Sequence, residues 1–208
     1  MAINVKLEEG NTLNRRDRGL TYLPREVDEQ HNMNVTVNLE DAAQSSCHIM
    51  LYSNVENAAE VRQMIMKGQV EASLIKPEMV VDPFQVLVAA NKAVRALAAK
   101  KMVTRSVYAE IIFNLSPSKN ITESLKNFGL GETDTEILAV VLDQESGEKV
   151  GKLNSQIKGQ QTSVKEMSHL TDRAKVKQVY KVTDAELEVS SLLDAVVSHI
   201  ACKECLVL

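Results

Sequence analysis

Residues 80–94 have the sequence VVDPFQVLVAANKAV, residues 110–117 have the sequence EIIFNLSP, and together these two stretches decide the fold class. Asp82 before Pro83 predicts a helix start, because an aspartate at the N-cap accepts backbone N–H groups and proline suits the first turn. The helix is predicted over 83–101, and its many alanines allow neighbouring elements to approach closely. The apolar run that opens the second stretch is typical of a buried strand. A helix followed by a buried strand indicates an α/β protein.

Hydrophobic patterning on either side of these stretches predicts the other elements. Alternating or continuous apolar runs predict strands, at 35–37, 48–52, 110–115, 137–142 and 176–182. Capping residues and terminal glycines predict helices, at 54–68, 83–101 and 120–129, with a short helix after Ser163 and a C-terminal helix after Thr183. The prediction is one mixed α/β domain over residues 35–208, with several α-helices packed on a small β-sheet. Residues 1–34 show neither periodicity and are predicted to be a flexible N-terminal extension.

The composition is that of a soluble globular protein. The chain has 208 residues, of which 44% are hydrophobic and 25% charged, and no apolar run approaches the ~20 residues that cross a bilayer. The N-terminus lacks the apolar core of a signal peptide, so we expect the protein in the cytoplasm and nucleus. Three cysteines in that environment do not make a disulfide framework.

The charge of the chain argues against one class of function and leaves another open. A formal net charge of −4 argues against nucleic-acid binding through global positive charge. Five basic residues nevertheless fall close together, Lys92, Arg95, Lys100, Lys101 and Arg105. Cations near a helix C-terminus stabilise its dipole, and they also suit the phosphates of a nucleic acid. The pattern alone does not decide between these two interpretations.

Motifs that carry chemistry are absent from the sequence. There is no glycine-rich phosphate loop, and the four histidines are scattered. Cys202 and Cys205 have CxxC spacing, but no second pair completes a tetrahedral zinc site, and the pair follows a helix instead of opening one. We therefore expect no catalytic residue, no metal site and no cofactor, and predict that the protein is not an enzyme. An enzyme that uses these two thiols is the alternative.

The last four residues, Cys205-Leu206-Val207-Leu208, match the C-a-a-X prenylation pattern. Prenylation of Cys205 would make the protein a peripheral membrane adaptor. No polybasic stretch precedes the motif, and a single lipid often needs a second signal, so a membrane partner is disfavoured. The other interpretation is an apolar tail that packs on a protein.

The predicted C-terminal helix has two distinct faces. A broad apolar stripe suits the core of the domain and consists of Val189, Leu192, Leu193, Val196, Val197 and Ile200. A second line contains short side chains at helical spacing, Ser191, Asp194, Ser198 and Ala201. Such a face either allows another helix to approach closely or is simply solvated.

Four blocks of the sequence resemble a known family. They are DPFQVLVAANKA at 82–93, EIIFNLSP at 110–117, the spacing of apolar and charged residues from Ile121 to Gly129, and LLDA at 192–195. They resemble the kinase-binding subunits of the KEOPS complex, also called EKC, the p53-related-kinase-binding protein family. The resemblance extends from about residue 35 to 201. The N-terminal extension and the segment 202–208 do not share it.

The resemblance implies a non-catalytic subunit of a tRNA-modifying complex. That complex installs threonylcarbamoyladenosine next to the anticodon, and another subunit carries out the chemistry. The subunit resembled here docks on a small kinase that acts as an ATPase and stimulates it. In related complexes it also holds the 3′ end of tRNA, and it meets the rest of the complex indirectly.

The resemblance also implies two contact surfaces. For the kinase, we predict contacts from the C-terminal helix, at Asp194, Val197, Ser198 and Ala201. For tRNA, we predict contacts from Asn91, Lys92 and Arg95, with Lys101 and Arg105 on the phosphates.

Overall fold

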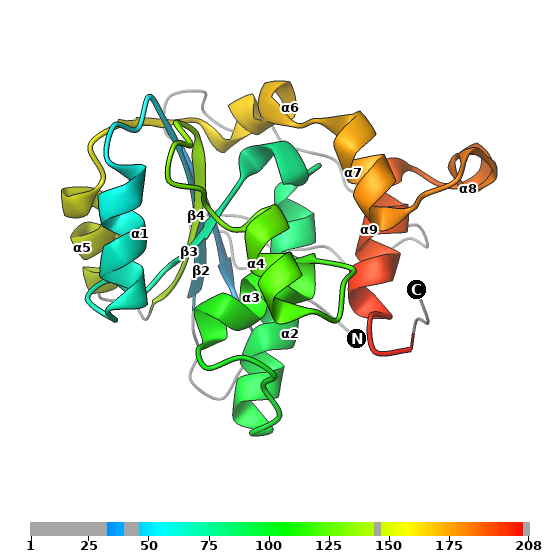
Figure 1. Ribbon diagram of the computed structural model, residues 1–208, viewed down its shortest axis with the longest axis horizontal. Helices are drawn as coiled ribbons and strands as arrows, with labels where there is room; N and C mark the ends of the chain where they lie inside the picture. Colours follow the sequence, from blue (N-terminus) through cyan, green and yellow to red (C-terminus); the bar gives the residue numbers. More distant parts are fainter. Residues whose placement is uncertain (1–32, 40–45, 144–146, 206–208) are drawn as a thin grey trace, which may run out of the picture.

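A five-stranded antiparallel sheet lies between two layers of helices in the computed structural model (Figure 1). The structure describes residues 33–39, 46–143 and 147–205. The strands are β1 Asn34–Asn38, β2 Ser46–Ser53, β3 Ser73–Ile75, β4 Ile137–Asp143 and β5 Gln160–Thr162. Their order is β1-β2-β4-β3, and β5 pairs with β2. The mixed α/β fold predicted from the sequence is confirmed. The predicted flexible extension lies almost wholly outside the described residues, and β1 begins at Asn34.

Strands β2 and β4 form the centre of the sheet. They pair in register from Ser46 opposite Asp143 to Tyr52 opposite Ile137. Every residue of β4 is buried, because helices cover both faces of the sheet. That arrangement explains why its sequence is a continuous apolar run instead of an alternating one. The strands predicted at 35–37, 48–52 and 137–142 are confirmed.

One face of the sheet carries most of the helices. These are α2 Pro83–Ala98, α3 Val107–Leu115, α4 Ile121–Phe128, α7 Arg173–Tyr180 and α9 Leu192–Ala201. The Asp82 carboxylate accepts a hydrogen bond from the Phe84 N–H at 2.8 Å, which confirms the predicted helix start. Ala89, Ala90 and Ala93 are fully buried in this layer. The helix ends at Ala98, three residues earlier than predicted, and Lys100 follows in a left-handed conformation.

The other face is covered by α1 Ala58–Met66 and α5 Glu148–Gln156. Gly68 ends α1 with a positive φ of 69°, as its position predicts. Asn54, which begins the predicted helix, lies instead in a left-handed turn after β2, and Asn57 occupies the N-cap. No helix in the described part of the chain is both long and apolar enough to cross a membrane.

The strand predicted at 110–115 is wrong, because these residues belong to helix α3. The Ser106 hydroxyl accepts a hydrogen bond from the Ala109 N–H and begins the helix. Six successive residues, 110–115, are buried, because α3 lies between α2, α4 and the sheet. A helix buried on all sides has no polar face, so its apolar run resembles that of a buried strand.

The C-terminal region also differs from the prediction. Residues 176–182 do not form a strand, because they lie in α7 and the turn after it. The helix predicted from Thr183 is two helices, α8 Asp184–Val189 and α9, and each begins with its own capping box. Ser163 opens a 3₁₀ turn, Val164–Glu166, which continues into the short helix α6, Met167–Leu170, as expected. A second 3₁₀ turn, Pro77–Met79, precedes α2.

A buried polar network fixes α7 against α2 and α3. The Gln85 side chain donates to the Met79 carbonyl and to the Tyr180 hydroxyl, both at 3.2 Å, and accepts from the Val81 N–H at 2.9 Å. The Tyr180 hydroxyl in turn donates to the Leu115 carbonyl oxygen. Each polar group therefore has a partner, which is what allows this glutamine and tyrosine to be buried.

Candidate functional site

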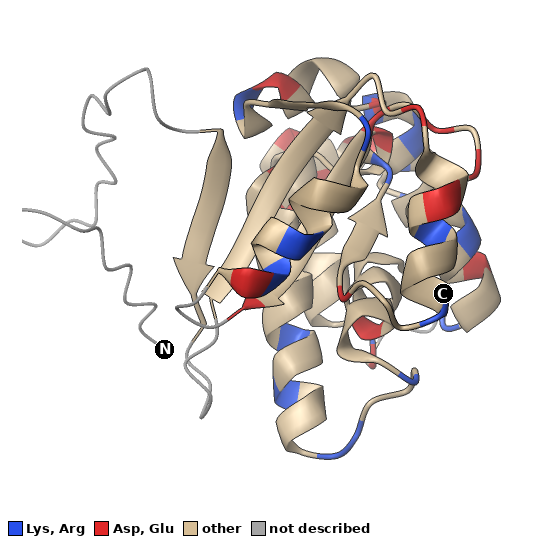
Figure 2. Ribbon diagram, turned by 90° about the vertical axis from the view of Figure 1, so that its left-hand side faces the viewer, with Lys and Arg blue, Asp and Glu red and all other residues tan. Residues whose placement is uncertain are grey.

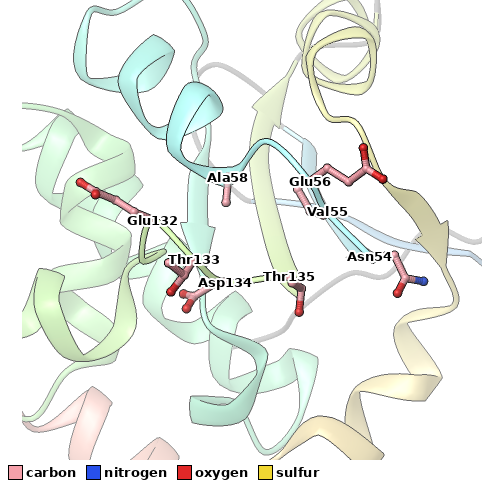
Figure 3. A pocket seen from close by; sticks show the side chains of 8 residues that line it. All are labelled: Asn54, Val55, Glu56, Ala58, Glu132, Thr133, Asp134 and Thr135. Carbon is pink, nitrogen blue, oxygen red and sulfur yellow. The ribbon is translucent and has the colours of Figure 1, made fainter.

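A shallow hollow of about 420 Å³ lies beside the loop between α4 and β4 (Figure 3). Glu132 and Asp134 line it, but Glu132 pairs with Arg62 at 3.0 Å and Asp134 accepts from the Gly131 N–H at 2.7 Å. Its lining residues include no histidine or cysteine. Across the described residues, no three metal-binding side chains converge. Among the residues that line the hollow, no nucleophile is paired with a base.

The residues predicted to contact a kinase lie on the outer side of α9. Asp194, Ser198 and Ala201 are exposed, and Val197 is half-buried. The opposite face of the same helix is buried in the core, through Leu192, Ala195, Val196 and Ile200. The structure thus brings the four predicted residues together on one accessible face of small side chains.

Asp194, one of these four residues, also caps the start of α9. Its carboxylate accepts hydrogen bonds from the Ser191 hydroxyl at 2.6 Å and from the Ser191 N–H at 3.2 Å. These bonds lower the pKa of Asp194 below its ordinary value. The Ser191 hydroxyl accepts from the Asp194 N–H at 3.1 Å, which completes the capping box. Asp194 therefore fixes the start of α9 and separates this helix from α8.

Two lysines hold the other end of α9 against the domain. The Lys92 ammonium on α2 donates to the Ile200 carbonyl at 2.5 Å and forms an ion pair with Glu204 at 3.0 Å. The Lys203 ammonium donates to the Phe113 carbonyl and lies 3.2 Å from the centroid of the Phe113 ring. Lys203 is only 3% exposed. These contacts tie the end of α9 to both α2 and α3.

Helix α8 adds an exposed apolar residue that the sequence assigned to the core. Val189 is 86% exposed, because the break at Ser190 and Ser191 separates it from the apolar stripe of α9. Three acidic residues lie on the same short helix, Asp184, Glu186 and Glu188. Figure 1 shows α8 projecting from the body of the domain beside α9.

A basic tip, defined as Arg95, Lys100, Lys101 and Arg105, lies at the C-terminal end of α2 and in the loop after it (Figure 2). All four side chains are exposed, and in the described part of the chain none of them forms an ion pair. The tip therefore presents uncompensated positive charge in a protein that is acidic as a whole.

The buried carboxylate of Glu110 holds the loop of the basic tip. It accepts hydrogen bonds from the Val103 N–H at 3.1 Å, the Thr104 N–H at 2.7 Å and the Thr104 hydroxyl at 2.7 Å. Glu110 is 2% exposed, so this anchoring takes place away from solvent. Two backbone N–H groups of the loop thus have a side-chain oxygen as acceptor inside the protein.

The five residues predicted to contact tRNA do not form one group. Arg95, Lys101 and Arg105 belong to the basic tip, whereas Lys92 faces the end of α9. Asn91 is half-buried on α2. The sequence gives no sign that Lys92 is engaged, because its partners are backbone carbonyls over a hundred positions away in the chain.

Sequence reasoning also missed Glu110, Lys203 and Val189. A charged residue in the apolar run 110–115 was the available signal for Glu110, since a buried carboxylate needs several donors. Lys203 and its neighbour Glu204 lie between the two cysteines of the CxxC spacing, a pattern that indicates thiol chemistry and not a buried lysine. The pair Ser190-Ser191 was the signal for the helix break that exposes Val189.

The three cysteines lie in two different environments. Cys47 on β2 is fully buried, and burial raises the pKa of its thiol to about 12. Cys202 and Cys205 are exposed and free. The remaining residues of the C-a-a-X motif, 206–208, lie outside the described residues.

Comparison with known proteins agrees with this picture. The family model "Kinase binding protein CGI-121" matches residues 52–204. The EKC/KEOPS complex subunit TPRKB of Danio rerio is 43% identical over 173 residues, which are 83% of this chain and 99% of the relative. The EKC/KEOPS complex subunit cgi121 of Aspergillus fumigatus is 30% identical over 143 residues, 65% of this chain and 76% of the relative. These matches confirm the resemblance, and the chain belongs to the non-catalytic CGI-121 family of kinase-binding proteins.

Proposed function

We propose that this protein is a regulatory subunit of a KEOPS/EKC complex in the cytoplasm and nucleus, where it docks on the small kinase through α9 and stimulates its ATPase. One observation carries the proposal. The family match over residues 52–204 includes the whole of α9, whose outer face is accessible and made of short side chains. Relatives from a fish and a fungus are both named as subunits of this complex.

The geometry of α9 suits a helix or strand of a partner. Ser198 and Ala201 leave room for close backbone approach, and Val197 on the same face supplies a half-buried apolar contact. The helix is fixed at both ends, by the Ser191–Asp194 capping box and by Lys92. A surface held rigid before binding loses less conformational entropy when the complex forms.

The acidic residues of the neighbouring helix α8 lead us to expect a positively charged surface on the partner. Glu188 and Val189 are exposed on α8 next to α9, since the two helices are in contact. Asp184 pairs with Lys177, and Glu186 is half-buried in its capping box. An acidic surface with an apolar residue at its edge complements a basic surface with an apolar pocket. We expect the face of the kinase that meets α8 to be basic.

A second part of the proposal concerns tRNA, which we assign to the basic tip. Four exposed cations without ion-pair partners in the described residues can contact several phosphates at once. The anchoring by Glu110 keeps their loop in one conformation. The basic tip shares no residue with the outer face of α9, so we expect kinase and tRNA to bind together.

Co-purification with the small kinase tests the main proposal. The full chain and the kinase are mixed, separated by size exclusion, and assayed for ATP hydrolysis with and without this protein. We expect a stable complex and faster hydrolysis. Separate elution together with an unchanged hydrolysis rate would contradict the proposal.

A further inference from the structure

The turn that follows α9 begins and ends with an exposed cysteine. The Cys205 N–H donates to the Cys202 carbonyl at 2.8 Å, which closes a four-residue turn. Such a turn brings its first and last Cα atoms within ~7 Å. A disulfide requires a Cα separation of roughly 4.4–6.8 Å, so the Cα separation in this turn is compatible with the bond.

We propose that Cys202 and Cys205 form a reversible intramolecular disulfide, made by exchange with a low-molecular-weight disulfide such as oxidised glutathione. Both thiols are free and exposed, so the oxidant can reach either of them. The two residues are already joined by a turn, so the second thiol is held near the first once that sulfur has reacted.

The exchange proceeds in two balanced steps. One cysteine thiolate attacks a sulfur of glutathione disulfide, whose S–S bond breaks, and one glutathione thiolate leaves. The other cysteine thiolate then attacks the protein sulfur of this mixed disulfide, and the second glutathione leaves. The protein loses two electrons and two protons, and two reduced glutathione molecules carry them away.

The position of the pair favours a structural bond over a redox enzyme. Catalytic CxxC pairs sit at a helix N-terminus, where the dipole lowers a thiol pKa, whereas this pair lies past the C-terminal end of α9. The two residues inside the turn are anchors of that end. Lys203 is buried against Phe113, and Glu204 pairs with Lys92. The disulfide would lock the turn that carries both anchors.

Thiol trapping across a series of glutathione redox buffers tests the proposal. The full native chain is equilibrated, free thiols are alkylated, and the products are weighed and mapped by mass spectrometry. We expect the two thiols to be lost together, with one peptide linking Cys202 to Cys205. Cys47 is an internal control and stays reduced, because it is buried with a raised pKa. Stable glutathione adducts on both residues, or two thiols that stay free throughout, would overturn the proposal.

Two single variants and one exchange measurement complete the test. Cys202→Ser and Cys205→Ser each retain one exposed thiol, so each should accumulate a single glutathione adduct and no internal bond. Amide hydrogen exchange in residues 202–205 should be about tenfold slower in the oxidised native chain. Equal rates of amide exchange in the oxidised and reduced forms would show that the disulfide does not restrain this turn.

Discussion

The ammonium group of Lys92 lies 2.5 Å from the carbonyl oxygen of Ile200, and this contact joins the middle of α2 to the end of α9. The same ammonium lies 3.4 Å from the Ala201 carbonyl and pairs with Glu204. A cation at this point satisfies carbonyls that the end of a helix leaves without partners. It therefore positions the helix that we assign to kinase binding.

Removal of this cation should loosen α9. We expect Lys92→Met to lower the free energy of unfolding by about 1–2 kcal/mol, because at least one helix-end carbonyl loses a charged donor. Urea denaturation measures the change. Lys152→Met on α5 is the matched control, and its effect should stay below about 0.5 kcal/mol, since the Lys152 side chain is exposed. Equal stability of Lys92→Met and the native chain would contradict this role.

Glu110 should prove essential for the order of the basic tip. Glu110→Gln leaves one acceptor oxygen for the three donors of the loop and places an amide donor against the Val103 N–H, so we expect a loss of about 2 kcal/mol in the free energy of unfolding. Amide exchange at Val103 and Thr104 should accelerate. The exposed Glu123 on α4 offers the control Glu123→Gln, which should leave these two amides unchanged. Native protection of the Val103 and Thr104 amides in Glu110→Gln would show that Glu110 does not hold this loop.

The buried Lys203 should make the free energy of unfolding depend on pH. Burial, followed by the charge of Lys92, lowers the pKa of Lys203 from 10.5 to about 8. Between these two pH values the unfolded chain binds a proton at Lys203 that the folded chain has released. The free energy of unfolding attributable to this group therefore rises with pH in that window.

The comparison with Lys203→Met isolates this effect from the other titrating groups. Urea unfolding of both proteins from about pH 7 to pH 10 gives the difference in stability at each pH. We expect the free energy of unfolding of the native chain to rise relative to that of the variant as the pH increases. A difference that stays constant, or that falls with pH, would show that the folded-state pKa of Lys203 is not lowered.

The tRNA assignment predicts a change in salt dependence. Arg95→Glu, Lys101→Glu and Arg105→Glu should each weaken binding to tRNA and reduce the slope of log affinity against log salt by about 1. Filter binding over a salt series measures both quantities. Lys152→Glu on α5 makes the same charge change on the other side of the sheet, and its slope should match the native one. Native affinity and slope in all three tip variants would refute the assignment.

The sequence predicts the elements that have one buried and one solvent-exposed face, and those that begin or end with a clear capping residue. Asp82 with Pro83 identifies the start of α2, and Gly68 the end of α1, because each acts through local backbone geometry. Strand β4, which is apolar from Ile137 to Leu142, is also predictable, since a short continuous apolar run flanked by turn residues suits a buried strand.

The elements that the sequence does not predict depend on tertiary contacts. Helix α3 has a buried surface on every side, so its apolar run lacks the polar face that distinguishes a helix. The engagement of Lys92 with Ile200 joins residues that only the fold brings together. The pattern of short side chains predicts the outer face of α9. The hydrogen bonds from Lys92 and Lys203 that hold the end of this helix are not predictable, because they join distant parts of the chain.

The affinity of this protein for the small kinase of the complex tests the central claim most directly, measured for two variants with the same new side chain. Ser198→Arg places a long cation on the outer face of α9, and Gln63→Arg places it on the exposed side of α1, across the sheet. We predict that Ser198→Arg raises the dissociation constant by about 30-fold, equivalent to ~2 kcal/mol, whereas Gln63→Arg binds like the native chain. Native affinity in Ser198→Arg, with the fold confirmed intact, would contradict kinase docking through α9.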